Sequence, residues 1–226
     1  MASIIRTAGL NRIFQSGRDT VHALRNINIS IEKGTLTMLR GRSGSGKTTL
    51  LNLLGALDQP SEGKIFFNDM EITGMSEETR DEIRRKSMGF VFQSIALISQ
   101  MTAYENVDFG LRVTGYEPDA REERAVKCLE LVGLDKRMRH FPHEMSGGEQ
   151  QRVAIARAIA HKPEVIFADE PTAELDTHMG LQVVKLFKDL VEYECLTVVM
   201  TTHDPNMMEV ANQVFTLEDG GIADGQ

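Results

Sequence analysis

The stretch Gly41-Arg-Ser-Gly-Ser-Gly-Lys-Thr48 decides the fold of this chain. It fills every fixed position of the pattern G-x-x-x-x-G-K-[ST], and it stands between a strand that we predict at residues 35–40 and a helix that we predict at residues 49–57. Its glycines allow successive backbone N–H groups to turn inward as an anion-binding nest, and the start of the helix adds partial positive charge. The pattern therefore predicts a phosphate-binding loop.

The side chains of this loop have expected roles toward a nucleoside triphosphate. Lys47 places an ammonium group near the β- and γ-phosphates, and the Thr48 hydroxyl can ligate Mg²⁺. Thr49 adds a hydroxyl near the α-phosphate. The residues that we expect to bind the phosphates are Gly41, Arg42, Ser43, Gly44, Ser45, Gly46, Lys47, Thr48 and Thr49.

A second motif, Val165-Ile-Phe-Ala-Asp-Glu170, is an apolar run that ends in two acids. Such a run is typical of a buried strand in a parallel sheet, and ligands bind at the carboxyl ends of these strands. Asp169 suits a role on Mg²⁺, directly or through a water ligand, and Glu170 suits a general base that takes a proton from the attacking water. Alone, the pair is equally consistent with an acidic helix cap. Beside a phosphate loop, it indicates nucleotide hydrolysis.

The rest of the chain alternates short strands with helices, which predicts an α/β fold with a mostly parallel sheet covered on both faces. The predicted strands are 27–31, 35–40, 64–67, 165–168, 196–201 and 213–217. The predicted helices are 49–57, 76–85 and 180–191, with a continuous helical pattern over 102–133. The helical middle of the chain therefore looks like an insertion into the sheet.

A third motif, Met145-Ser-Gly-Gly-Glu-Gln-Gln-Arg152, contains a second helix start beside glycines, with Ser146 as the expected N-cap. A lone Ser-Gly-Gly is an ordinary helix cap. Together with the phosphate loop, Ala156-Arg-Ala158 and Asp169-Glu-Pro-Thr172, however, it resembles the L-S-G-G-Q signature of the ATP-binding cassette ATPases. The resemblance covers essentially the whole chain.

The resemblance implies a RecA-like P-loop NTPase fold in a single domain, 1–226. Residues 1–93 and 160–226 would form the nucleotide-binding core with an N-terminal antiparallel β-subdomain, and 94–159 would form an inserted α-helical subdomain that carries the signature. In the family, two copies bind ATP head-to-tail, and the signature of one copy closes over the ATP of the other. This implies an ATP-dependent homodimer with ATP-contacting residues Ser146, Gly147, Gly148 and Glu149.

Further family motifs match particular residues. Gln93 matches the glutamine that faces Mg²⁺ and the attacking water, and His203 matches the switch histidine near the γ-phosphate. Glu174-Leu-Asp176 matches the loop that crosses the dimer interface, called the D-loop in the family. Phe14 matches the aromatic residue that stacks on adenine, where tyrosine is more usual.

Three other positions depart from the family pattern. Met145 replaces a leucine, which is a near-isosteric apolar exchange. Glu149 replaces a glutamine, although glutamate there is familiar in the family. Ala173-Glu174 replaces a pair of small residues and adds a charge close to the implied dimer interface, which bears on dimer strength rather than on the chemistry.

One branch of the family is most similar. The stretch Ser43-Gly-Ser-Gly-Lys-Thr-Thr-Leu-Leu-Asn-Leu-Leu-Gly-Ala-Leu-Asp58, together with Phe90-Val-Phe-Gln93 and Thr102-Ala-Tyr-Glu-Asn106, resembles the ATPase subunits of the MacB, LolD and FtsE type. These subunits drive a membrane partner in efflux or lipoprotein extraction. ATPase subunits of amino-acid importers are broadly similar and remain an alternative, as does a soluble cassette ATPase without a transport role.

Composition and charge limit the partners. The chain has 226 residues, a net charge of -8 and a pI near 5.3, whereas nucleic-acid binding usually leaves a basic footprint, so we expect no nucleic-acid partner. No apolar run approaches the ~18 residues of a membrane span, and the first residues lack a secretory signal. We therefore expect a cytoplasmic protein that is peripheral on the inner face of the membrane. The resemblance implies a separate integral permease, bound at a groove near Gln93 and Met101.

Other functional classes fit the sequence less well. Cassette ATPases that repair DNA or organise chromosomes carry long coiled-coil or zinc insertions, which this sequence lacks. Soluble translation factors of the family carry two cassettes in one chain. An inactive regulatory cassette would lack part of the set Lys47, Asp169, Glu170 and His203, all of which are present. The transported substrate depends on the permease.

Overall fold

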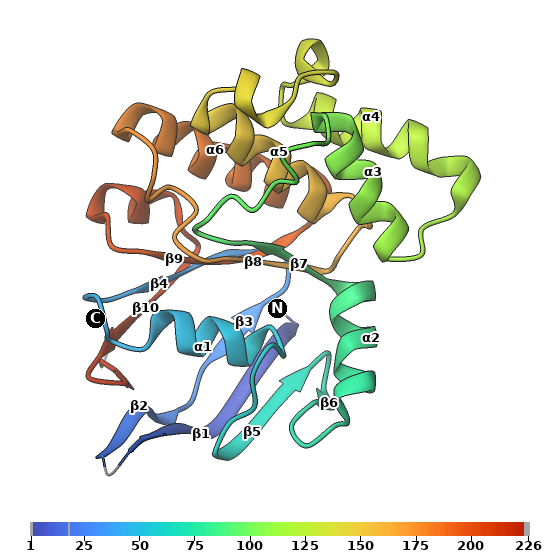
Figure 1. The fold of residues 1–226 in the computed structure, drawn as a ribbon. Helices are drawn as coiled ribbons and strands as arrows, with labels where there is room; N and C mark the ends of the chain where they lie inside the picture. Colours follow the sequence, from blue (N-terminus) through green and yellow to red (C-terminus); the bar gives the residue numbers. More distant parts are fainter. Residues whose placement is uncertain (1, 18, 224–226) are drawn as a thin grey trace.

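A six-stranded, mostly parallel sheet crosses the centre of the molecule (Figure 1). The computed structural model describes residues 2–17 and 19–223. The strands lie in the order β11-β10-β4-β9-β8-β7, and every neighbouring pair except β10 and β11 is parallel. Their bounds are β4 Leu36–Arg40, β7 Met88–Val91, β8 Val165–Ala168, β9 Thr197–Thr202, β10 Gln213–Glu218 and β11 Gly221–Ile222. Strands β8 and β9 are buried throughout, because helices cover both faces of the sheet.

The register of this sheet brings three chain segments to one edge. Arg40 at the end of β4 pairs with Thr202 in β9, and Ala168 at the end of β8 pairs with Met200. Because parallel strands run in the same direction, the residues that follow β4, β8 and β9 meet at the carboxyl edge of the sheet.

A second, antiparallel sheet lies below the first in Figure 1. Its long strand β1 pairs with β2, β3 and β5, and β5 continues to β6. The bounds are β1 Ser3–Ser16, β2 Asp19–Ile27, β3 Ser30–Glu32, β5 Glu62–Phe67 and β6 Met70–Glu71. The predicted fold class, a P-loop core with an N-terminal antiparallel sheet, is confirmed.

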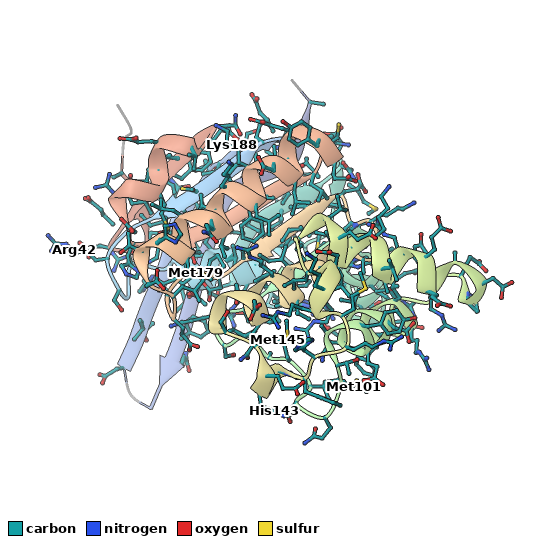
Figure 2. All side chains as sticks on the ribbon, turned by 90° about the horizontal axis from the view of Figure 1, so that it is seen from above. Arg42, Met101, His143, Met145, Met179 and Lys188 are labelled. Carbon is teal, nitrogen blue, oxygen red and sulfur yellow. The ribbon has the colours of Figure 1, made fainter. Side chains whose placement is uncertain are left out.

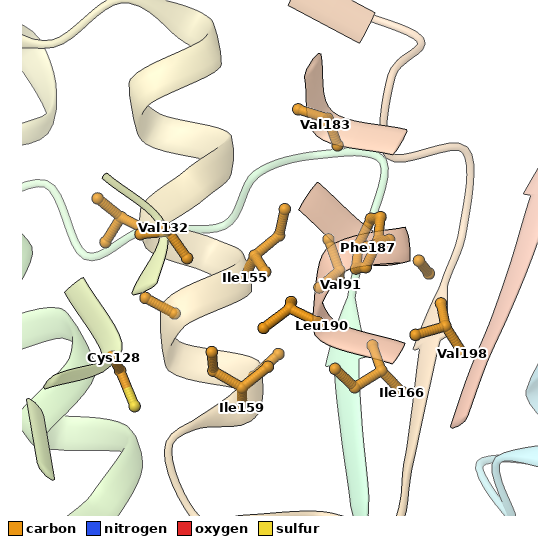
Figure 3. Close-up of a cluster of buried hydrophobic side chains, with 14 of the residues drawn as sticks. Val91, Cys128, Val132, Ile155, Ile159, Ile166, Val183, Phe187, Leu190 and Val198 are labelled. Carbon is orange, nitrogen blue, oxygen red and sulfur yellow. The ribbon is translucent and has the colours of Figure 1, made fainter. Parts of the chain in front are cut away.

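The helices form two layers around the central sheet. The bounds are α1 Lys47–Leu54, α2 Glu77–Ser87, α3 Ala103–Val113, α4 Arg121–Leu131, α5 Gly147–Ile159 and α6 Thr177–Glu194, with short 3-10 turns at Pro118–Ala120, Asp135–Arg137, Pro142–Glu144 and Pro205–Val210. Helix α1 lies between the two sheets, and its leucines join both in one apolar cluster. Helices α3 to α6 share the other apolar cluster, where Phe187 and Leu190 of α6 pack near Ile155 of α5 and Ile166 of β8 (Figure 3).

Two predicted elements are each divided in the structure. The predicted strand 27–31 is broken, because β2 ends at Ile27 and β3 begins at Ser30. The Thr7 hydroxyl donates to the Ile27 carbonyl and accepts from the Ile29 N–H, and it thereby replaces strand pairing at the break. The helical pattern over 102–133 is two helices, α3 and α4. Gly115, at φ 74°, and Pro118 separate them.

Candidate active site

The phosphate loop connects β4 to α1 at the carboxyl edge of the central sheet. Gly46 is the N-cap of α1 at φ 103°, and a Cβ atom there would lie 2.6 Å from the Ala23 carbonyl oxygen. A Cβ on Gly41 would lie 2.4 Å from the Leu217 carbonyl oxygen. Both positions therefore require glycine, because any side chain there would collide with a backbone carbonyl.

The interior of this loop is arranged to receive an anion. The Lys47 side chain is only 5% exposed, and its Nζ donates to the carbonyls of Gly41 at 2.8 Å and Arg42 at 3.2 Å. The Ser45 hydroxyl is buried and has no hydrogen-bond partner within residues 2–17 and 19–223. A buried ammonium and an unpartnered hydroxyl in a glycine cradle fit the phosphates of a nucleotide.

An open cleft of about 670 Å³ lies beside the loop. The phosphate loop lines it together with His203 and the turn between β10 and β11. The lining residues are Arg40, Gly41, Arg42, Ser43, Gly44, Ser45, His203, Thr216, Leu217, Glu218 and Asp219.

Asp169 follows β8 and lies beside the start of α1. The Thr48 hydroxyl donates to Asp169 Oδ1 at 3.1 Å, and the Thr201 hydroxyl donates to the same oxygen at 2.7 Å. The structure thus brings together Thr48 and Asp169, the hydroxyl and carboxylate that the sequence assigned to Mg²⁺. Oxygen ligands of this kind are the ones that Mg²⁺ prefers.

Glu170 lies between two cationic or titratable side chains. Its Oε1 is 3.7 Å from Lys47 Nζ, and its Oε2 is 3.3 Å from His203 Nδ1. Its backbone has φ 41°, a left-handed conformation that residues other than glycine adopt rarely. Lys47, Glu170 and His203, which the sequence placed in three separate motifs, therefore form one cluster at the sheet edge.

The signature segment forms a helix cap, as predicted for Ser146. The Ser146 hydroxyl accepts from the Glu149 N–H, and the Ser146 N–H donates to Glu149 Oε2 at 2.8 Å, which completes a capping box on α5. This backbone hydrogen bond lowers the pKa of the Glu149 carboxyl. Sequence reasoning assigned Glu149 to the nucleotide and missed this local role, although the spacing S-x-x-E indicates it.

The signature and the phosphate loop of one chain do not form a common site. Ser146 and Gly147 are exposed, whereas Gly148 is buried against Met179. Figure 2 shows Met145, the first residue of the signature, well separated from Arg42 of the phosphate loop. Each chain therefore presents two separate helix starts, one in the phosphate loop and one in the signature.

Gln93 and the segment after it lie on the surface beside β7. Gln93 is exposed, and among the described residues no hydrogen bond joins it to Asp169 or Glu170. The buried Asn106 side chain holds this segment by bonds to the backbone of Ile98 and Met101. Gln93 stands two residues after Val91, whose carbonyl accepts the Asp169 N–H at 2.9 Å, so it leaves β7 at the same sheet edge as the acid pair.

Phe14 lies near the tip of the β1–β2 hairpin, opposite Val21, and is 39% exposed. The Arg12 guanidinium covers one face of its ring at 4.4 Å from the centroid, and Arg12 is held by Asp58 at 2.9 Å. The ring is therefore outside the core and is oriented by a cation–π contact.

Sequence reasoning missed one residue of the cluster, Thr201. Its hydroxyl contacts both acids, because it donates to Asp169 Oδ1 and accepts from the Glu170 N–H at 2.7 Å. The only sequence signal was a hydroxyl residue two positions before His203.

The fold and the site define a P-loop NTPase, because a phosphate loop, a strand-end acid pair and a histidine meet at the edge of a parallel sheet. Comparison with known proteins gives the family. The model of the ABC transporter family matches residues 24–173. The chain belongs to the ABC transporter family, as an ATP-binding, ATP-hydrolysing subunit.

Known relatives are similar in sequence to this chain over nearly its whole length. An uncharacterised ABC transporter ATP-binding protein of Methanocaldococcus jannaschii is 42% identical over 98% of both chains. The macrolide export ATP-binding/permease protein MacB of a Shewanella species is 39% identical over 98% of this chain, which spans 34% of that protein. A solved cassette structure, described as a dimeric post-hydrolysis state bound to ADP and phosphate, has a TM-score of 0.89 and 36% identity over 98% of this chain and 97% of that one. The predicted similarity to MacB is confirmed.

Proposed function

We propose that this chain hydrolyses ATP at the cluster of Lys47, Asp169 and Glu170 and thereby drives a separate membrane permease. The position of Glu170 carries the proposal. Its carboxylate lies within 3.7 Å of the buried Lys47 ammonium and within 3.3 Å of His203, directly beside the phosphate loop. A carboxylate held there can accept a proton from a water molecule that attacks the γ-phosphate.

Different residues of the site would bind the phosphates and Mg²⁺. The backbone N–H groups and the Ser45 hydroxyl bind phosphate oxygens, and Lys47 exchanges its two carbonyl partners for the β- and γ-phosphates. Thr48 and Asp169 would hold Mg²⁺, with Gln93 joining them. When bound, Mg²⁺ neutralises phosphate charge.

The roles of Glu170 and His203 follow from their contact. Glu170 would take the proton of the water, and His203, which also lines the cleft beside the phosphate loop, would orient that carboxylate near the γ-phosphate. Residues 94–159 would form a helical subdomain that carries the signature, beside the nucleotide-binding core formed by 1–93 and 160–226.

We infer a homodimer in which the signature of one chain completes the nucleotide site of the other. The exposed Ser146 and Gly147 at the start of α5 suit phosphate oxygens of the partner's ATP, and solved relatives are described as dimeric cassettes. The capping box leaves the Glu149 carboxylate on its own helix, so Glu149 would act by shaping the cap. A net charge of -8 per chain and the exposed Glu174 oppose association without ATP.

Phe14 provides a test of base recognition. Phe14→Ala should raise the apparent Michaelis constant for ATP about tenfold, because stacking on an aromatic face contributes about 1–3 kcal/mol. Phe14→Tyr should be nearly neutral, and ATP should be favoured only weakly over GTP. The matched control is Val21→Ala, which removes the exposed cross-strand neighbour. A lower melting temperature with unchanged ATP affinity would instead assign Phe14 to hairpin stability.

The permease is the proposed partner of the surface beside β7. Among the described residues, no helix has the length and apolarity needed to cross a bilayer. The MacB relative combines an ATP-binding part with a permease by its name, and this chain aligns with 34% of its length. We propose that the permease binds the surface formed by residues 93–101, beside the exposed ring of Phe92. The proposed location is the cytoplasmic face of the membrane.

Affinity purification from detergent-solubilised membranes of the source cells tests this partner. An integral membrane protein should copurify with the tagged chain, and Phe92→Asp should abolish its recovery, because a charge would be placed in an apolar contact. Tyr193→Asp, at an exposed aromatic residue on α6, is the control and should retain the partner. Recovery of soluble proteins alone would contradict a transporter role.

A further inference from the structure

Thr201 is a buried threonine at the point where the central strands end. It is the last but one residue of β9, its relative exposure is 0%, and it pairs with Leu39 of β4. On the other side of β9, Met200 pairs with Ala168, so Thr201 lies level with the acids that follow β8. Every residue of β9 is buried, and the hydroxyl of Thr201 therefore needs hydrogen-bond partners within the protein.

The hydroxyl finds both of its partners in the acid pair. It donates its single proton to Asp169 Oδ1 at 2.7 Å, and it accepts the backbone N–H of Glu170 at 2.7 Å. A carboxylate oxygen can only accept and an N–H can only donate, so the direction of both bonds is fixed. One side chain thus links the carboxylate assigned to Mg²⁺ with the backbone of the residue assigned as base.

The hydrogen bond from the Glu170 N–H matters because the backbone of Glu170 has an unfavourable conformation. Glu170 has φ 41°, and a residue other than glycine stays in the left-handed region only where its surroundings hold it. The N–H that Thr201 accepts belongs to that residue. The same backbone conformation places the Glu170 carboxylate near Lys47 and His203.

The structure assigns Thr201 as a positioning residue for ATP hydrolysis, an inference that rests on the proposed role of Glu170. Its hydroxyl holds the left-handed backbone of Glu170 and the rotamer of Asp169 at the same time. It thereby fixes the position of Glu170, the proposed base, relative to Asp169, the carboxylate proposed to hold Mg²⁺. Removal of the hydroxyl should slow the chemical step much more than it weakens ATP binding, because the phosphate loop itself is unchanged.

Two substitutions at Thr201 separate the hydroxyl from the shape of the side chain. Thr201→Val keeps the branched shape and should lower kcat about 10- to 100-fold, with the Michaelis constant for ATP within about threefold of the original. Thr201→Ser keeps the hydroxyl and should retain kcat within about threefold. In the nucleotide-free protein, the Glu170 N–H should exchange with deuterium faster in Thr201→Val than in Thr201→Ser.

Thr197→Val is the matched control for a purely structural effect. Thr197 is also buried in β9, and its hydroxyl accepts the N–H of Gly34 at 3.1 Å, but it lies at the opposite end of the strand. This control should lower the melting temperature comparably to Thr201→Val and leave kcat unchanged. Equal kcat losses in Thr201→Val and Thr197→Val would mean that Thr201 serves stability alone, and the inference would be overturned.

Glu170→Gln, measured in the same assay, separates the inference from the proposed function. An inactive Glu170→Gln with a fully active Thr201→Val would overturn the positioning role and leave the assignment of the base intact. An active Glu170→Gln would overturn the assignment of the base itself. Loss of kcat in Thr201→Ser as large as that in Thr201→Val would also contradict the role of the hydroxyl.

Discussion

Glu170→Gln is expected to lower steady-state phosphate release by at least about 100-fold, the range that general-base catalysis contributes. The amide keeps the shape of the side chain but cannot take a proton from water. ATP binding should persist or tighten, because the phosphate loop and Lys47 are unchanged and a negative charge 3.7 Å from the Lys47 ammonium is removed. Phosphate release and calorimetric ATP binding, measured on the same preparation, check both expectations.

The control for this variant is Glu164→Gln, at the opposite end of the same strand. Glu164 precedes β8, is half exposed and contacts Asn68 at 2.9 Å, far along the strand from the phosphate loop. Its substitution should leave turnover unchanged. Turnover of Glu170→Gln near that of Glu164→Gln would remove Glu170 from the chemistry.

Lys47→Ala is expected to fail at an earlier step, the binding of ATP. A hydrogen bond to a charged group contributes about 1.5–3 kcal/mol, so the affinity for ATP should fall about 10- to 100-fold. Lys47 contacts phosphates in the ground state as well as in the transition state, so the loss appears in binding and not only in turnover. Calorimetric titration with ATP measures the effect directly.

The binding loss must be distinguished from unfolding, because the Lys47 side chain is buried. The melting temperature without nucleotide gives that control. Lys86→Ala removes an equal charge from an exposed position on α2 and should leave ATP affinity unchanged. If Lys47→Ala and Glu170→Gln bound ATP equally well, the separate roles given to the two residues would be contradicted.

The parts of the site that the sequence predicted are those encoded within a few residues. The phosphate loop places its glycines and Lys47 by local geometry, and the run before Asp169 is apolar enough to indicate a buried strand without knowledge of its neighbours. The cap at Ser146 is likewise local. These features could be predicted because strand and helix ends constrain the residues beside them directly.

The parts that the sequence did not predict depend on long-range register. Thr201 meets Asp169 only because β9 lies beside β8 with Met200 opposite Ala168, and nothing within β9 specifies that pairing. The placement of Arg12 over Phe14 depends in the same way on Asp58, which holds the guanidinium from 46 residues further along the chain. The break between α3 and α4 is different, because Gly115 and Pro118 are local helix-breaking signals. The apolar periodicity on both sides of them nevertheless led to the prediction of one continuous helical segment.

The most direct test of the account is the mass and the nucleotide content of Glu170→Gln after incubation with Mg-ATP. Light scattering during size exclusion gives the mass, and extraction of the eluted protein identifies the nucleotide. We expect a monomer without nucleotide and, with Mg-ATP, a dimer that carries one unhydrolysed ATP per chain. A chain that stays monomeric with ATP, or a dimer that holds ADP, would contradict a composite site in which Glu170 drives hydrolysis.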